Sequence, residues 1–587
     1  MHPRLVPLMS AALLVTAAAC SSSTEGSARI RVDQLGFVTD GVKHAYLMAA
    51  DAPESFRVVA ESGTVVLESA PSSTAARWSD AYPAVRVLDL TAVTTPGQYR
   101  VEAAGAVSPP FRIDAAQALF AGPVADTARF FVTQHDTAHT ADRAADVYAA
   151  PRYDPDGKTL LDPALTKVGG PVDVSGGWFD AGDFLKFTHT TSYATAQLLL
   201  AQRDSPVHSD AVAAEARYGL DWLGRVWDGS TLYAQVGIGA GNEGVLTDHD
   251  VWRRPQDDDA LDVAPGDPKY HVKHRPVFRA NEPGTPVSPN LAGRVAAAFA
   301  LSAQVAPDPT SARRSLDTAA TLFAKADTSG APLVTAFPRT FYPETAWQDD
   351  LEFAAVELAL AGRTLGDPRS ADWQTAAARW ATAYLDSDTR GTLGLADVSA
   401  LAHADLARIS DGPLKERLVT DLERQLDEGV SRAAKDPFGA GAVYTEFDSV
   451  PHTFGLVITA ALHHSVTGDS RYDAFGTTQR GWALGANAWG SSFVIGIGTT
   501  FPRCPEHQGA NLTGDTPTGA VVNGPNAATQ FTELNAFEGM KPCTVNDFEP
   551  YDGHDARYVD HVGAWQSVEP AIDFTSTGLL AFALSAR

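Results

Sequence analysis

The chain has 587 residues, of which 44% are hydrophobic and 20% are charged. This composition is typical of a soluble globular protein, and the length indicates several domains or one large domain with a small one. The formal net charge of -26 argues against a nucleic-acid-binding protein, and it favours a neutral or cationic substrate over a polyanionic one.

Residues 1–20 are predicted to be a lipoprotein-type signal peptide. Residues 5–19 are mostly apolar, and Cys20 follows three alanines. The apolar run is too short to span a bilayer stably and fits an export signal. It resembles a bacterial lipoprotein signal, in which Cys20 would carry the lipid; the alternative is simple secretion with Cys20 lost or free. Residues 21–28 then form a flexible tether.

Two further cysteines, Cys504 and Cys543, lie near the C-terminus. In an exported protein such residues can form a disulfide. Their spacing alone does not fix the pairing.

Residues 29–113 contain short segments that are mostly rich in β-branched residues, and several alternate apolar with polar residues. Clusters of Gly, Pro and Ser separate them. This pattern predicts an antiparallel β-sandwich. No catalytic cluster stands out in it, so we interpret it as a structural or docking module.

Residues 117–587 are predicted to form one large helical domain. Apolar residues recur there at three- and four-residue steps, which indicates helices. So many helical segments favour a large helical domain over a four-helix bundle. We expect the functional residues in the loops between them. The predicted helices cover residues 192–203, 211–226, 290–305, 312–325, 346–363, 371–384, 414–428 and 471–484, and a final helix ends near Ala586.

Residues 173–183 are the most informative stretch. They place Asp180 and Asp183 three residues apart among glycines, directly after two aromatic residues. Glycine permits a tight loop, which would hold two acids close together beside an aromatic wall. One carboxylate could hold a water molecule while the other activates it as a general base. The alternatives are an ordinary turn or a metal site built from oxygen ligands.

Three residues in other loops are candidates for sugar binding. His249 and His507 could hydrogen-bond to hydroxyl groups, and Trp252 could stack on the apolar face of a sugar ring. The alternative for each is a packed core or loop residue.

Two acidic runs have structural explanations. Residues 257–259 are three consecutive aspartates, interpreted as a solvated loop rather than an ion site. Asp349 and Asp350 begin an apolar helix, where the helix dipole favours acids.

Glu569 lies between Val568 and Pro570 at the start of the last apolar helix. An apolar setting raises the pKa of a carboxyl group and keeps it protonated, as a general acid requires. The alternative is a helix-start acid without a catalytic role.

Taken together, these motifs resemble glycoside hydrolase family 9, which includes many bacterial and plant cellulases. Residues 173–183 match its catalytic-base motif, and Glu569 with Asp573 matches its general-acid motif. Asp248, His249 and Trp252 match its Asp-His-x-x-Trp loop, and residues 501–507 resemble its histidine motif. Residues 29–37 and the strands after them look like the immunoglobulin-like domain found in one branch of the family.

The resemblance implies an immunoglobulin-like β-sandwich followed by an (α/α)6 barrel with a cleft across one end. It implies inverting hydrolysis of β-1,4-glucosidic bonds, with Asp183 as general base, Asp180 helping to hold the water and Glu569 as general acid. An inverting pair needs carboxyl groups about 6.5–9.5 Å apart to fit that water. His249, Trp252 and His507 would bind sugar.

The sequence departs from the family pattern at Gln508, where Arg is usual, and at Val568, where Asn is frequent. Both changes bear on the substrate. The chemistry requires no cofactor. Some relatives bind zinc through cysteine and histidine ahead of the base motif. No cysteine lies between Cys20 and Cys504, so we predict no such zinc site. A structural calcium ion is common in the family, but its ligands here are unknown.

The sequence therefore predicts an exported β-1,4-glucanase, lipid-anchored at the cell surface or otherwise secreted, that touches a membrane only through its lipid. Its partner is a β-glucan, and it binds no nucleic acid. One alternative is an exo-acting relative that removes units such as glucosamine from chain ends. The other is a glucan-binding lipoprotein without catalysis, which the presence of both Asp183 and Glu569 disfavours.

Overall fold

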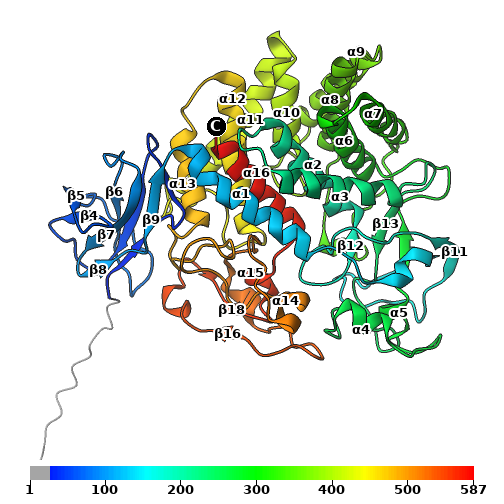
Figure 1. Cartoon of the computed structure of the whole chain (residues 1–587), viewed down its shortest axis with the longest axis horizontal. Helices are drawn as coiled ribbons and strands as arrows, with labels where there is room; N and C mark the ends of the chain where they lie inside the picture. The colour runs from blue at the N-terminus through cyan, green and yellow to red at the C-terminus, as the bar shows by residue number, and fades with distance from the viewer. Residues whose placement is uncertain (1–26) are drawn as a thin grey trace, which may run out of the picture.

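A computed structural model describes residues 27–587, in which a small β-rich unit lies at one end of a much larger helical unit (Figure 1). The predicted signal peptide, Cys20 and most of the tether lie outside the described residues.

The β-rich unit consists of two sheets that enclose a core. The core includes Leu47, Val58, Leu88, Val101 and Ile113, all of them fully buried. This architecture confirms the predicted β-sandwich. One sheet has the order β1 (Arg29–Arg31), β3 (His44–Met48), β6 (Val85–Asp89); the other has the order β2 (Gly36–Val38), β9 (Phe111–Asp114), β7 (Gly97–Ala103), β4 (Phe56–Ala60), β5 (Val65–Ser69), with β8 (Ala106–Val107) beside β7. Only β2 and β9 pair in parallel among these strands of the described chain.

The helical unit, within residues 27–587, is a closed ring of six inner helices surrounded by six outer ones. The inner helices contact one another in chain order, and the last packs against the first. They are α2 (Thr188–Asp204), α6 (Pro289–Val305), α8 (Gln348–Leu365), α10 (Ser399–Arg408), α12 (Ser449–Thr467) and α16 (Ile572–Ser585). The outer helices are α1 (Ala116–Thr133), α3 (Asp210–Val226), α7 (Pro309–Ala324), α9 (Ser370–Leu385), α11 (Gly412–Ala433) and α13 (Asp473–Ala483). This ring confirms the (α/α)6 barrel.

Inner and outer helices differ in sequence because they differ in burial. In α3 and α11 one face is buried and the other is solvated, which produces the periodicity that the sequence displays. In α16 nearly every residue is buried, and in α12 most residues up to His463 are, so apolar residues occur all round these helices. The predicted helices did not include α1, α10 or α12. Helix α1 contains Pro123, and α10 is only 10 residues long.

The loops carry short elements that gather on the lower side of the barrel in Figure 1. A five-stranded sheet has the order β11 (Lys167–Val172), β10 (Ala145–Tyr148), β14 (Val277–Arg279), β13 (Tyr233–Val236), β12 (Lys186–Phe187). The short helices are η1 (Thr140–Ala144), α4 (Pro255–Asp259), α5 (Tyr270–Lys273), η2 (Arg339–Phe341), α14 (Gln508–Thr513), η3 (Ala528–Phe531), η4 (Glu549–Tyr551) and α15 (Trp565–Val568). Two strand pairs complete the set, β15 (Asn526–Ala527) with β17 (Ala556–Arg557) and β16 (Thr544–Val545) with β18 (Asp560–His561).

Cys504 and Cys543 form a disulfide, so the two cysteines do pair. The bond fastens the loop before α14 to the segment before β16. Closing a loop of this length restricts the unfolded chain and so stabilises the folded one.

The sandwich is fixed to the barrel by polar and aromatic contacts. The Gln34 side chain donates to the carbonyl oxygens of Gly490 and Thr500, and its own oxygen accepts from the backbone N–H groups of Thr499 and Thr500. Trp78 packs edge-on against Phe438 and Trp489 of the barrel. Tyr46 and Met48 of the sandwich, like Trp78, therefore belong to the apolar core of the barrel, whereas the core between the two sheets is separate from it.

Within the described part of the chain, none of the helices combines the length and apolarity needed to cross a bilayer.

We expect Trp78→Ala to weaken this junction. Trp78 is 2% exposed, and its ring nitrogen donates to the Tyr551 carbonyl oxygen at 2.8 Å. Truncating a buried tryptophan costs about 3–5 kcal/mol of unfolding free energy. The midpoint of urea unfolding, followed by circular dichroism, should fall clearly. Val107→Ala, at a site 55% exposed on the same sandwich, should change it little, and equal midpoints for the two variants would contradict the assignment.

Candidate active site

The loop of residues 173–183 turns sharply because its glycines adopt backbone angles that other residues resist, or fill spaces too small for a side chain. Gly176 and Gly177 have φ angles of +73° and +77°. A Cβ atom on Gly182 would lie 2.2 Å from the carbonyl oxygen of Glu506. The tight loop predicted from the glycines is therefore present, and one of its glycines allows close approach of a second loop.

Backbone hydrogen bonds join this loop to two other segments of the site. The Asp180 carbonyl oxygen accepts from Ile572 N–H at 2.9 Å, at the start of α16. The Gly182 carbonyl oxygen accepts from Gln508 N–H at 2.7 Å, at the start of α14. The segments before α14 and α16 carry Glu506 and Glu569, so the candidate base and acid are held in one framework.

The two aromatic residues before Asp180 support the loop from behind. Trp178 is fully buried against Phe131, and its ring nitrogen donates to Glu215. Phe179 is also buried and packs against Phe184. They form no exposed wall beside the acids, contrary to the sequence interpretation.

Asp180 is almost completely buried, with 1% of its surface exposed. The hydroxyl of Thr190 donates to one carboxylate oxygen, and the hydroxyl of Tyr342 donates to the other. Burial raises the pKa of Asp180 to about 7, and the neighbouring Asp183 adds to the rise. Asp180 therefore titrates near neutral pH rather than in the acidic range.

Asp183 is paired with His249. His249 Nε2 lies 2.8 Å from an Asp183 oxygen, and His249 Nδ1 lies 2.8 Å from the Gly239 carbonyl oxygen. Although burial opposes protonation, the hydrogen bond and charge of Asp183 raise the pKa of His249 to about 9. At neutral pH both ring nitrogens donate, and the other Asp183 oxygen accepts from Leu185 N–H at 2.8 Å. Asp183 and His249, which the sequence suggested separately as general base and sugar-binding residue, thus form an ion pair.

Glu569 follows the short helix α15 and is partly exposed to solvent. Burial, followed by the charges of Glu506, Asp183 and Asp180, raises its pKa well above the ordinary value. A carboxyl group that stays protonated near neutral pH is what general acid catalysis requires. The apolar neighbours of Glu569 in the sequence predicted a raised pKa, and the structure gives the same direction.

Glu506 is a site residue that the sequence interpretation did not include. Its charge interacts with those of His249, Asp183 and Glu569. Burial, opposed by the His249 cation and reinforced by Asp183, raises its pKa to about 8. The available signal was its position, directly before His507 in the histidine motif.

His507 and Trp252 are placed differently from the sugar-binding residues that the sequence suggests. His507 Nδ1 accepts from Ala510 N–H, and Nε2 lies 2.8 Å from Gln134 Oε1, so both ring nitrogens are occupied within the protein. Burial lowers the pKa of His507 to about 4. Trp252 is 3% exposed and contacts Phe537. Neither side chain presents a free group to a ligand in this conformation, and sugar binding by them stays a prediction.

The acidic run at residues 257–259 is not simply a solvated loop, which corrects the interpretation. It forms α4, and Asp258 is 2% exposed and paired with Arg253 at 3.1 Å. Asp349 and Asp350 do lie in the first turn of α8 as predicted. Both are buried, and Asp350 pairs with Arg294.

The described residues contain one group with metal-ligand character: Asp136, His139 and Asp142, whose ligand atoms lie within 4.8 Å of one another. The amino group of Lys186 lies 2.7 Å from each of the two carboxylates. These residues do not fit a metal ion, because a cation of the protein already binds the two carboxylates. A structural calcium ion elsewhere stays a prediction.

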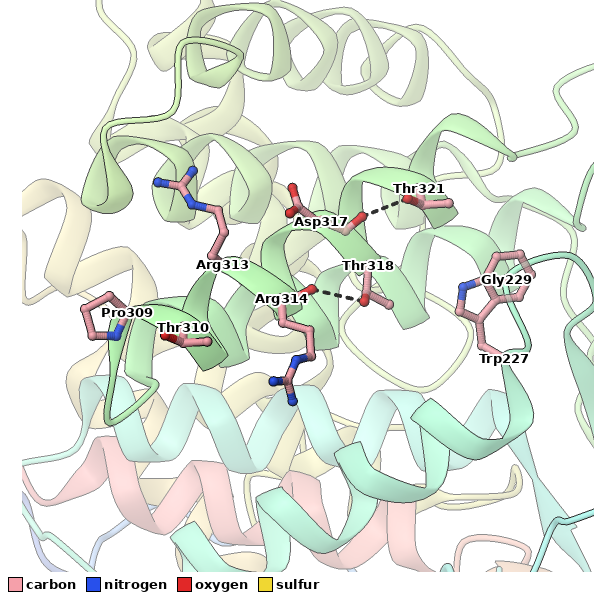
Figure 2. Close-up of a pocket in the computed structure, with 9 residues that line it drawn as sticks. All are labelled: Trp227, Gly229, Pro309, Thr310, Arg313, Arg314, Asp317, Thr318 and Thr321. Carbon is pink, nitrogen blue, oxygen red and sulfur yellow. Dashed lines mark hydrogen bonds between the residues drawn. The ribbon is translucent and has the colours of Figure 1, made fainter.

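A surface hollow of about 720 Å³ lies on the outer helix α7, beside Trp227 (Figure 2). The hydroxyls of Thr318 and Thr321 are bonded to carbonyl oxygens of their own helix. None of the candidate site residues lines this hollow, so it is separate from the candidate active site.

Comparison with known families decides the class of this barrel. The model of glycosyl hydrolase family 9 matches residues 121–582, and that of the cellulase N-terminal ig-like domain matches residues 25–108. The chain belongs to glycosyl hydrolase family 9. The resemblance inferred from the sequence motifs is thereby confirmed.

Several curated endoglucanases are similar to the chain over most of its length. Endoglucanase C of Cellulomonas fimi is 26% identical over 93% of this chain and 51% of its own. Endoglucanase A of Bacillus pumilus is 24% identical over 68% of this chain and 61% of its own. The chain thus spans about half to three fifths of the length of these two curated relatives.

The solved structures give the same fold. The crystal structure of the family 9 endoglucanase J30 superposes with a TM-score of 0.72 at 24% identity, over 94% of this chain and 99% of that one. A zinc-binding triple mutant of J30 superposes equally well. A metagenome-derived family 9 endoglucanase superposes with a TM-score of 0.70 at 21% identity, over 95% of this chain and 99% of that one.

We expect Tyr342→Phe to move the acidic limb of the pH–rate profile to higher pH. The Tyr342 hydroxyl lowers the pKa of Asp180, so its removal raises that pKa and leaves less Asp180 ionised at a given acidic pH. One charge-assisted hydrogen bond corresponds to a shift of about one pH unit. The measurement is kcat/KM against pH on a soluble β-1,4-glucan.

Tyr472→Phe is the matched control, because the Tyr472 hydroxyl also donates to a carboxylate, that of Asp427, but between the outer helices α11 and α13. Its profile should coincide with the wild type. An acidic limb that stays in place in Tyr342→Phe would show that ionised Asp180 is not needed.

Proposed function

We propose that the chain is an inverting endo-β-1,4-glucanase that hydrolyses cellulose or related β-glucans. The observation that carries the proposal is the pairing of a partly exposed Glu569, whose pKa is raised, with the Asp180–Asp183 loop at the loop end of a family 9 barrel. An inverting hydrolase requires one protonated and one ionised carboxyl group on opposite sides of the scissile bond.

In this proposal Glu569 protonates the departing glycosidic oxygen. Asp183 removes a proton from the attacking water, while His249 fixes the orientation of the Asp183 carboxylate through the 2.8 Å hydrogen bond. Asp180 helps to hold the same water. No metal ion or cofactor takes part in these steps. The His249 ring is partly exposed, and we propose that it contacts sugar.

We propose different roles for the two residues that are enclosed by the protein. His507 is hydrogen-bonded to Gln134, whose amide donates to the carbonyl oxygens of Phe179 and Ala181 in the base loop. Trp252 supports Phe537, which packs against His249. Both residues would then shape the site from behind rather than touch sugar.

One observation favours a second candidate, an exo-acting enzyme on amino sugars. Glu506 adds a further carboxyl group beside Asp183 and Glu569. Because the pKa of Glu506 is raised to about 8, this acid would attract a glucosamine ammonium group in its ionised form, at mildly alkaline pH. The net charge of -26 attracts cationic oligomers in general. The curated relatives above are named endoglucanases, so glucan remains the first proposal.

Product analysis tests the proposal directly. The enzyme is incubated with soluble β-1,4-glucan and, separately, with chitosan oligomers, and the anomeric configuration of new ends is followed by NMR. Internal cuts in glucan with α-products are expected. Cleavage of chitosan ends alone would favour the exo-acting candidate, and no product from either substrate would favour a glucan-binding protein without catalysis.

Glu569→Gln should remove turnover on the active substrate while leaving its binding intact. Loss of a general acid lowers kcat at least about 100-fold. The control is Glu428→Gln, an exposed acid on the outer helix α11. It should behave as the wild type. Unchanged turnover in Glu569→Gln would refute the assigned acid.

We further propose that the chain is exported and anchored by a lipid on Cys20, which lies outside the described residues. In fractionated cells the wild type should be found with membranes, and Cys20→Ala should be released into the soluble fraction. Removal of Cys20 should release the protein because the lipid on this residue would supply the membrane affinity. Each methylene of a lipid chain that is buried in the bilayer contributes about 0.8 kcal/mol. Equal membrane association of both forms would contradict the anchor.

A further inference from the structure

A buried ionic cluster lies directly behind the base loop. Asp136, His139 and Asp142 follow α1 at three-residue steps and are 5%, 4% and 0% exposed. Carboxylates and imidazoles at such distances are common metal ligands. Their charge is neutralised here by side chains of the protein itself, those of Lys186 and Arg275.

The ammonium group of Lys186 is surrounded by oxygen atoms. Its Nζ atom lies 2.7 Å from oxygens of Asp136 and Asp142, 3.0 Å from the Val174 carbonyl oxygen and 2.9 Å from the Gly176 carbonyl oxygen. Lys186 is 0% exposed. Three N–H bonds facing four oxygens leave the ammonium fully coordinated, as a bound cation would be.

Arg275 supplies the second positive charge. Its Nη1 atom lies 2.9 Å from His139 Nδ1, 3.3 Å from Asp142 and 3.5 Å from Asp136. Its other terminal nitrogen donates to the Phe184 carbonyl oxygen. Two cations therefore face two carboxylates. Burying these four charges together costs far less free energy than burying the two carboxylates, or the two cations, without their counter-charges.

The cluster holds both ends of the loop that carries the candidate base. At the start of the loop, Lys186 binds the carbonyl oxygens of Val174 and Gly176. At its end, Arg275 binds the Phe184 carbonyl oxygen, and Lys186 itself lies three residues after Asp183. The intervening Asp180 and Asp183 are thus fixed from behind without a direct contact from Lys186.

We propose that Lys186 is a positioning residue that occupies the place of a metal ion behind the base loop. Its ammonium cross-links the loop to Asp136 and Asp142, so the loop is ordered without a bound metal. Without the Lys186 side chain, two carboxylate and two carbonyl oxygens would face one space. Hard divalent cations such as Ca²⁺ prefer such oxygen ligands.

The test is Lys186→Ala, measured with and without millimolar CaCl₂. We expect the melting temperature of this variant to fall and then to rise when Ca²⁺ is added, because the ion replaces the ammonium. This rise should exceed any rise that Ca²⁺ produces in the wild type, where a structural ion bound elsewhere would act equally on both forms. This arm needs no activity, so it decides the proposal even if the proposed hydrolysis is wrong.

The kinetic arm rests on the proposed function. Because Lys186 does not touch the substrate, Lys186→Ala should lower kcat about 100-fold through misplacement of the base, with KM for soluble glucan within about threefold of the wild type. Ca²⁺ should restore most of the lost kcat. Wild-type kcat in Lys186→Ala without added ion would overturn the positioning role.

Lys43→Ala is the matched control. Lys43 is also fully buried, and its Nζ atom donates to the carbonyl oxygens of Thr39 and Gly41 at 2.8 Å. This lysine lies in the sandwich and binds no carboxylate in the described chain. Lys43→Ala should lose stability without gaining any response to Ca²⁺. An equal response in both variants would overturn the proposal.

If Lys186→Ala does not fold, metal analysis of the wild type still decides. The purified full chain is equilibrated with Ca²⁺ or Zn²⁺, and bound metal is compared with that in Asp142→Asn. Equal metal contents are expected, because Lys186 already occupies the cluster. A stoichiometric ion that is present in the wild type and lost in Asp142→Asn would overturn the proposal.

Discussion

Four carboxyl groups, those of Asp180, Asp183, Glu506 and Glu569, interact at the loop end of the barrel, with the His249 cation among them. Burial and mutual repulsion oppose ionisation of the whole set, so the groups settle into different protonation states. Asp183 has the histidine as counter-charge, whereas Glu569 lacks one. The separation into a base and an acid follows from this unequal compensation.

In the cluster behind the loop, by contrast, the carboxylates are fully matched by cations. Asp136 and Asp142 are as buried as Asp180, yet each faces the ammonium of Lys186 at 2.7 Å. Buried carboxylates that face a cation form rigid cross-links, whereas burial without a full counter-charge raises the pKa values of Asp180, Glu506 and Glu569. Two sets of acids separated by one short loop therefore serve structure and chemistry respectively, and the difference between them is the placement of cations.

The local motifs in the sequence predicted much of this arrangement. The glycines around Asp180 and Asp183 specify a tight loop, and the apolar neighbours of Glu569 specify a desolvated acid, because both properties depend on residues adjacent in the chain. The β-sandwich and the amphipathic outer helices were also predictable from periodicity. Inner helices such as α6 and α16 were predictable as well, from long apolar segments, whereas α12 was not among the predicted segments.

The remaining site residues depend on contacts between distant segments, which no local pattern encodes. Glu506 approaches Asp183 because Gly182 admits its backbone. Nε2 of His507 is hydrogen-bonded to Gln134, which lies 373 positions away in the chain. Lys186 resembled an ordinary strand residue until the fold placed Asp136 and Asp142 beside it. Residue type at a motif position therefore indicates a candidate, but hydrogen-bond partners decide its role.

The sandwich participates in the same framework rather than standing apart from it. Gln34 fixes the backbone of Thr499 and Thr500, and the chain runs from there through Cys504 to Glu506 within six residues. The disulfide to Cys543 holds that same stretch from the other side. The loop that brings Glu506 against Gly182 is thus anchored at one end by the β-sandwich and in its middle by a covalent bond. An error in docking the sandwich would accordingly be transmitted to the carboxyl groups through a short and stiff segment.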